Sequence, residues 1–195
     1  MFLARRPTLH VIDRFLRESQ DLPLSYGPIG IVRTRPEGFD VDEVTVAIGQ
    51  GQADFERAQA AFLAWKQFDI EWVETFPRQA SIEVGSVVAV LIRRLGIWSL
   101  NGCRVVYNVG SPGDVDRFGF AYGTLTNHGE SGEELFEVFI DPTTDAVMYR
   151  IRAASRPQAP LAQLGKPIVR ALQERFRNHS VAAMKLATRT IDVRA

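Results

Sequence analysis

Hydrophobic and polar positions alternate through the middle of the chain in a way that is typical of β-strands. Such runs cover residues 39–48, 70–75, 85–92, 103–109, 117–125, 135–140 and 146–155. Residues that favour turns separate them, including Asn101-Gly102 and the stretches 111–114, 129–132 and 141–142. Because strands joined by short turns pair with their neighbours in opposite directions, the sequence predicts an antiparallel sheet.

Three other segments repeat their apolar residues at helical spacing. The first stripe consists of Leu9, Ile12, Phe15 and Leu16, and the second of Phe55, Ala58, Phe62 and Trp65. The third and longest consists of Leu161, Leu164, Ile168, Leu172, Phe176, His179 and Ala183. We therefore expect residues 159–184 to be mostly helical, with a kink or split near Gly165 because Pro167 interrupts the helix. The side chains expected to contact the sheet are Leu164, Ile168, Leu172 and Phe176.

This order of elements predicts an α+β fold in which a curved antiparallel β-sheet wraps around a long C-terminal helix. A half-buried sheet needs one face covered, and the last amphipathic helix is its obvious cover. We expect this domain to span residues 39–190. Residues 1–38 contain the first helix and an irregular, Pro- and Gly-rich segment. We expect that segment to pack on the domain through Tyr26 and Ile29.

Composition narrows the possible partners and compartments. Lysine plus arginine and aspartate plus glutamate both number 23, so no basic excess suggests nucleic-acid binding. The single cysteine, Cys103, excludes an intrachain disulfide framework and favours a reducing, cytoplasmic location. It is expected to be a small buried hydrophobe. No stretch approaches the roughly twenty apolar residues of a membrane span, and no secretory signal is expected.

Several polar clusters suggest chemistry but have simpler structural explanations. The segment Gly49-Gln50-Gly51-Gln52 resembles a phosphate-binding turn, yet Asp54 replaces the third glycine of a dinucleotide fingerprint, so we expect no nucleotide there. His128 sits among acidic residues in a predicted turn, and one histidine is too few for a metal site. We expect no metal and no cofactor. Arg150 and Arg152 share a strand face and, together with Arg104 on another strand, either hold an anion or lie in a solvated surface.

Aromatic side chains on the predicted strands indicate a site inside the fold. Strand alternation places Phe118, Phe120, Tyr122 and Thr124 on one face, and neighbouring strands add Tyr107 and Tyr149. His179 lies on the apolar stripe of the last helix. The predicted ligand-binding residues are Tyr107, Phe120, Tyr122, Tyr149 and His179. Buried phenols need partners, and a cavity that admits a polar ligand end supplies them.

Several motifs resemble an uncharacterised family catalogued as domain of unknown function 1990. They are the run from Phe118 to Leu125, His128, Gly132-Glu133-Glu134 and Ser155-Arg156-Pro157, with Tyr26, Gly30, Gly49, Gly51, Phe55, Ala58, Trp65 and Phe68 earlier in the chain. The sequence departs from the family pattern at Gly129 and Ala154. The resemblance implies the helix-grip fold of the START and Bet v 1-like superfamily. Members of that superfamily commonly hold lipids, steroids or polyketide-like molecules between sheet and helix.

Three functions remain open at this point. The first is a binding module for a small, mostly apolar ligand such as a lipid or polyketide-like metabolite. The second is an enzyme, a cyclase, dehydratase or hydrolase, that uses the same cavity with Tyr122, Tyr149 and His179 as inward proton-transfer candidates. The third is a ligand-free interaction domain, in which outward-facing Leu135, Phe139 and Met148 form a surface for a partner or homodimer.

Overall fold

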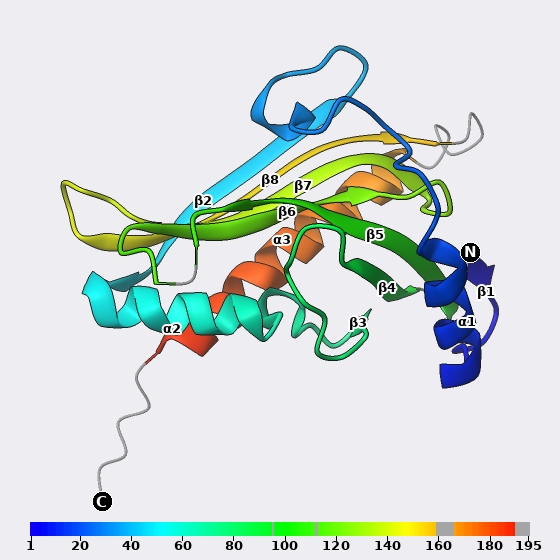
Figure 1. Cartoon of the computed structure of the whole chain (residues 1–195), viewed down its shortest axis with the longest axis horizontal. Coiled ribbons are helices and arrows are strands. Elements are labelled where there is room, and N and C mark those ends of the chain that lie inside the picture. The colour runs from blue at the N-terminus through cyan, green and yellow to red at the C-terminus, as the bar shows by residue number, and fades with distance from the viewer. Residues whose placement is uncertain (95, 112, 159–165, 190–195) are drawn as a thin grey trace, which may run out of the picture.

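The computed structural model describes residues 1–94, 96–111, 113–158 and 166–189, with side chains from residue 170 onward in the last segment. Its centre is an 8-stranded antiparallel sheet with the strand order β2-β8-β7-β6-β5-β4-β3, to which β1 adds by pairing with β5. Figure 1 shows that the sheet is curved and that α2 and α3 lie along one side of it. This is the curved sheet around a C-terminal helix that the sequence predicts.

The strands are β1 (Phe2–Leu3), β2 (Asp40–Gln50), β3 (Val73–Phe76), β4 (Val87–Arg94), β5 (Ile97–Val109), β6 (Arg117–Thr124), β7 (Glu130–Ile140) and β8 (Ala146–Pro157). The helices are α1 (Leu9–Ser19), α2 (Gly51–Leu63) and α3 (Lys166–Thr188), with short 3-10 turns η1 (Ile31–Arg33) and η2 (Lys66–Phe68). The described residues contain no helix that is long and apolar enough to cross a membrane.

One predicted turn is wrong, because Asn101 and Gly102 lie inside β5. Their residue types serve close packing instead of chain reversal. A Cβ at Gly102 would come within 2.3 Å of the Asn127 Oδ1 atom, so only glycine leaves room for that side chain. The Asn101 amide donates to the Val90 carbonyl oxygen at 3.3 Å. Glycine and asparagine therefore do not mark a turn when a neighbouring segment approaches the strand this closely.

The final helix is described from Lys166, so the predictions for residues 159–165, the split near Gly165 among them, lie outside the described residues. The same holds for the predicted contacts of the Leu164 and Ile168 side chains. Phe176 packs on the sheet as predicted, with its ring centroid 6.4 Å from that of Phe136. Leu172 is half-buried and lies beside a surface groove.

Aromatic rings fill the space between the sheet and the helices. They come from α2, η2, β6, β7, β8 and α3: Phe62, Trp65, Phe68, Phe118, Phe120, Tyr122, Phe136, Tyr149 and Phe176. Phe68 lies near the middle, with its ring centroid 5.3 Å from that of Phe176 and 5.4 Å from that of Phe136. Rings of this size contribute large buried areas, so this aromatic layer dominates the stability of the fold.

The opposite face of the sheet is covered by the N-terminal segment, which crosses above the strands in Figure 1. Ile31 and Val32 of η1 pack there against Leu135 and Ala154. The Tyr26 ring lies over Gly123, where a Cβ would come within 2.3 Å of the phenol oxygen. Leu135 is consequently buried, so one of the three residues proposed for a partner surface is already covered by the chain itself.

Truncation of Phe176 tests the role of the aromatic layer. The ring is half-buried, so we expect Phe176→Ala to lower the free energy of unfolding by about 2–3 kcal/mol, below the cost for a fully buried ring. Urea unfolding at constant pH measures this change. Leu186→Ala is the control, because Leu186 lies on the same helix and is 70% exposed. Equal losses in the two variants would contradict the packing described here.

Candidate ligand site between the sheet and α3

Three of the predicted ligand-binding residues face the interior. Phe120, Tyr122 and Tyr149 are all buried in the aromatic layer. The Tyr149 hydroxyl shares a 2.8 Å hydrogen bond with Ser180 of α3, which ties the helix to β8. This phenol is therefore satisfied by the protein itself, without a ligand or water.

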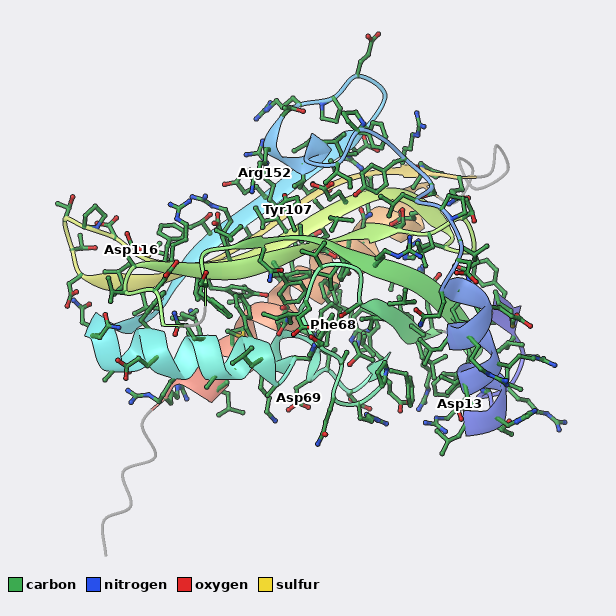
Figure 2. The ribbon with its side chains drawn as sticks, viewed as in Figure 1. Asp13, Phe68, Asp69, Tyr107, Asp116 and Arg152 are labelled. Carbon is green, nitrogen blue, oxygen red and sulfur yellow. The ribbon has the colours of Figure 1, made fainter. Side chains whose placement is uncertain are left out.

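Tyr107 faces the other side of the sheet, which corrects the predicted alternation. The pairing of β5 with β6 shifts register between Val105 and Tyr107, so a β-bulge reverses the direction of the side chain. Val105 is in the inner core while Tyr107 packs with the N-terminal segment. Figure 2 shows Tyr107 and Phe68 on opposite sides of the sheet.

His179 does not point into the aromatic layer either. It is exposed on α3, and its ring lies edge-on to Trp72 with the ring centroids 6.1 Å apart. Its place on the apolar stripe of the sequence puts it at the border of the buried helix face. The interior pair of a histidine and a tyrosine that an enzyme could use is thus not formed.

The polar group that lies beside Tyr122 in the interior is the carboxyl group of Glu134. Glu134 lies directly opposite Tyr122 in the register of β6 and β7, and so projects from the same face of the sheet. The Tyr122 hydroxyl donates a 2.6 Å hydrogen bond to Glu134 Oε2. Glu134 Oε1 has no hydrogen-bond partner among the described residues. Glu134 as a residue is half-buried and lies beside the aromatic layer.

Burial changes the protonation of this pair. Loss of hydration raises the pKa of Glu134 to about 7, although the hydrogen bond from Tyr122 and the positive charge of Arg177 act in the opposite direction. Burial and the nearby Glu134 carboxylate also raise the pKa of Tyr122 well above its ordinary value. Near neutral pH, Glu134 therefore exchanges a proton readily while Tyr122 remains a donor.

Two polar side chains of α3, Gln173 and Arg177, interact with Glu130 and Glu134 on this face of β7. The Gln173 amide donates to both oxygens of Glu130, at 3.2 and 3.1 Å, and to Ser155 Oγ at 3.0 Å. Arg177 lies 3.6 Å from an oxygen of Asp42 and acts on the charge of Glu134. We call Tyr122, Glu130, Glu134, Gln173 and Arg177 the inner polar cluster. It gives one end of the aromatic interior several donors and acceptors at once.

Gln67 of η2 is a second unusual group in the interior. Its side chain is fully buried, and neither the nitrogen nor the oxygen of its amide has a hydrogen-bond partner within the described residues. The next residue, Phe68, belongs to the aromatic layer. Burying an unpaired amide costs roughly 1–3 kcal/mol, so a bound water or ligand that pairs with it would be stabilised.

Two surface hollows, of about 480 and 280 Å³, lie on the described part of the chain. Neither is lined by Tyr122 or Tyr149. Between the sheet and the helices, where the sequence places a ligand, the aromatic rings pack against one another. The predicted pocket of a few hundred Å³ stays a prediction.

The outer face carries a matching carboxylate that the protein satisfies completely. Glu133 is 2% exposed and accepts hydrogen bonds from the Tyr26 hydroxyl at 2.7 Å, the Gly30 amide at 2.8 Å and the Tyr107 hydroxyl at 3.1 Å. Burial raises the pKa of both phenols. Two of these donors, Tyr26 and Gly30, fix the N-terminal segment to the sheet, which gives Glu133 a structural role.

The other sequence candidates also have structural roles. Asp54 accepts the Gln50 backbone N–H at 2.7 Å, so a carboxylate already occupies the glycine-rich turn. His128 Nδ1 accepts the Glu130 N–H at 2.9 Å, and burial lowers the pKa of the His128 ring to about 4.

The arginines on the outer strand face are likewise engaged. Arg150 and Arg152 both form ion pairs with Glu43, each at 3.4 Å. Cys103 is buried, and burial raises the pKa of its thiol. No three His, Cys, Asp or Glu residues gather into a possible metal site within the part of the chain that the structure describes.

The sequence already held the signal for Glu134. Phe136 and Val138 face the inner core, so a period of two along the same strand places Glu134 on that face. The sequence predicts this strand only from residue 135, because residues 129–132 suggest a turn, whereas β7 begins at Glu130. A strand that starts earlier than expected therefore carries a carboxyl group into the interior.

Comparison with known proteins gives a consistent family and fold. The family model described as Domain of unknown function (DUF1990) matches residues 25–183. A UPF0548 protein of Dictyostelium discoideum is 33% identical over 90% of this chain and 90% of its own length. A UPF0548 protein of Deinococcus radiodurans is also 33% identical, over 92% of this chain and 94% of its own.

Solved structures show the same fold at low identity. Hypothetical protein jhp0584 from Helicobacter pylori matches with a TM-score of 0.57 and 11% identity, over 84% of this chain and 95% of that one. The di-domain ARO/CYC BexL matches with a TM-score of 0.55 and 16% identity, over 82% of this chain and 53% of that one. The Zhui aromatase/cyclase from Streptomyces matches with a TM-score of 0.50 and 16% identity, over 77% and 93%. These likenesses establish the helix-grip, Bet v 1-like fold.

The raised pKa of Glu134 predicts a specific pH dependence of stability. Its folded pKa of about 7 lies above its ordinary value of 4.5, so its contribution is complete below pH 4.5 and is lost as the pH rises through 7. Glu134→Gln removes this loss. The unfolding free energy of the variant relative to the wild type should therefore rise by up to about 3 kcal/mol from acidic to neutral pH. Urea unfolding across this pH range measures it, and a constant difference would contradict the burial of Glu134.

Proposed function

The chain belongs to the family described as Domain of unknown function (DUF1990), and from its geometry we propose that it binds a small, mostly apolar molecule. The ligand lies between the sheet and α3, with its apolar body among the aromatic rings and its polar end at Tyr122 and Glu134. A lipid or a polyketide-like metabolite has this chemistry. Phe120 and Tyr149 are the further residues that we propose to contact it.

One observation carries this proposal: the carboxyl group of half-buried Glu134, at the end of an aromatic interior, has one oxygen without a hydrogen-bond partner among the described residues. A fully packed structural core gains nothing from such a group, because a buried carboxyl with one donor is costly. The contrast with Glu133, which has three donors, shows how the same chain satisfies a carboxylate whose role is structural. The unpaired amide of Gln67 supports the same conclusion.

The structural neighbours are compatible with a ligand-binding function, but the proposal does not depend on them. Two of them are described as an aromatase/cyclase and a di-domain ARO/CYC. At 16% identity their likeness shows the fold alone, and a fold supports many functions. The assignment to this chain therefore rests on its own residues.

A matched pair of variants tests the location of the ligand. Tyr122→Trp enlarges a side chain in the interior, whereas Tyr107→Trp makes the same change on the outer face. We expect an environment-sensitive apolar dye to bind the wild type and to be displaced by fatty acids or aromatic polyketides. Tyr122→Trp should weaken dye binding about tenfold or more, and Tyr107→Trp should leave it unchanged. Equal dye affinity in the two variants, or no dye binding to the wild type, would contradict the proposal.

A second function, proton-transfer catalysis on the bound molecule, is favoured by the pairing of Tyr122 with a carboxyl group whose pKa is about 7. Such a group exchanges protons in either direction at neutral pH. Cyclisation, dehydration and hydrolysis all require a proton to be moved. The inner pair thus replaces the histidine and tyrosine pair that the sequence suggested for an enzyme.

Native mass spectrometry of freshly purified protein separates carrier from enzyme. We expect a small molecule to be retained by the wild type and also by Tyr122→Phe, which keeps the ring and removes the hydroxyl. If the protein is an enzyme, the two should retain molecules of different mass, because the variant holds unconverted substrate. Identical masses would leave ligand binding as the function and contradict catalysis.

A further inference from the structure

A second candidate site lies outside the aromatic interior. The groove of about 480 Å³ is formed where the β4–β5 hairpin and the segment before β3 meet α3. It is lined by Glu71, Trp72, Arg93, Arg94, Gly96, Ala171, Leu172 and Arg175. None of these residues belongs to the inner polar cluster, so the groove can be treated independently of the proposed interior ligand.

The groove is cationic. Arg94 lies on the α3 side of β4 and Arg175 lies on α3, so two positive charges meet one carboxylate, that of Glu71, and leave a local charge of about +1. The Arg93 guanidinium lies on the other face of the strand, over Trp98. Within the part of the chain that the structure describes, Arg94 and Arg175 form no ion pair. Arg150 and Arg152, by contrast, are occupied by Glu43 on the outer face of the sheet.

An aromatic contact orients one of these guanidinium groups. The Arg175 guanidinium carbon lies 5.4 Å from the Trp72 ring centroid. Cation–π contacts of this kind restrict the side chain while leaving its N–H groups free to donate. A guanidinium that is already oriented loses less freedom when it binds an oxyanion bidentately.

The remaining lining adds an apolar wall to this charge. Trp72, Ala171 and Leu172 lie along the same groove as the arginines. An inorganic anion would leave this wall unused, whereas an anion carried on an apolar group would contact both. Two guanidinium groups on opposite walls also match a doubly charged phosphate better than a singly charged carboxylate.

We propose that this groove binds the phosphate group of a monoester whose organic part is apolar. Arg94 and Arg175 donate to the phosphate oxygens from opposite walls, one from the hairpin and one from the helix. The organic part lies against Trp72 and Leu172. A soluble phosphate ester and the headgroup of a phospholipid both offer this chemistry.

Calorimetric titration of the full chain with phenyl phosphate tests the proposal, with benzoate and inorganic phosphate as comparison ligands. We expect saturable binding of phenyl phosphate and weaker binding of both comparison ligands, because benzoate lacks the second charge and phosphate lacks the ring. Arg175→Gln and Arg94→Gln should each weaken phenyl phosphate binding about tenfold or more, as expected for a lost charge-assisted hydrogen bond.

Arg35→Gln is the charge-matched control, because Arg35 is exposed and lies in the N-terminal segment, away from the groove. Absence of saturable binding overturns the proposal. So does an equal loss in Arg35→Gln, which would indicate unspecific charge attraction, and so does benzoate or inorganic phosphate binding as tightly as phenyl phosphate.

Vesicles distinguish the two sources of the ligand. Co-sedimentation with phosphatidylcholine vesicles that contain phosphatidate, lost in Arg175→Gln and absent without phosphatidate, identifies the phosphate of a lipid headgroup. Binding of phenyl phosphate without such co-sedimentation identifies a soluble ester. Either result supports the groove as a phosphate site. Equal sedimentation with and without phosphatidate would show that the protein attaches to vesicles independently of the phosphate group, and would overturn the lipid source.

Discussion

Two consecutive glutamates on a central strand set the constraint around which this structure is built. Glu133 and Glu134 project to opposite faces of β7, and protein covers both faces. A carboxyl group removed from water must find donors. Three donors from β5 and the N-terminal segment meet Glu133, while a single phenol meets Glu134. One carboxylate thus fastens the outer layer, and the other keeps an open oxygen inside.

The aromatic layer follows from the same arrangement. Strands that place Phe120, Tyr122 and Phe136 on one face need a cover of equal bulk, which α2, η2 and α3 supply through Phe62, Phe68 and Phe176. The phenols inside this layer already have protein partners, in Glu134 and Ser180. The argument that buried tyrosines require a wet cavity is therefore not needed here. The amide of Gln67, by contrast, is buried without a hydrogen-bond partner among the described residues.

Periodicity in the sequence was sufficient to predict the sheet, the three helices and the sheet face that α3 covers. It failed where a local irregularity changes the period, because a bulge between Val105 and Tyr107 turns one predicted ligand residue outward. It also failed at Asn101 and Gly102, whose turn-like chemistry serves close packing against Asn127. The site residue Glu134 was within reach of strand alternation, whereas the pairing of β6 and β7 that places it against Tyr122 depends on register, which a single sequence does not reveal.

The long strand β2 stands at the end of the sheet order, and sheet edges of this kind invite other chains to add a strand. Inward-facing charged residues on an edge strand oppose such strand addition, and β2 carries Asp40 and Asp42 in that position. Asp40 and Asp42 pair with Arg170 and Arg177 of α3, so the charges that attach the helix also interrupt the edge. The two aspartates that attach the helix therefore also place charged groups along the edge strand. Replacing both aspartates by neutral residues would weaken the attachment of α3 to β2. It would also remove the charges that oppose pairing of β2 with a strand of another chain.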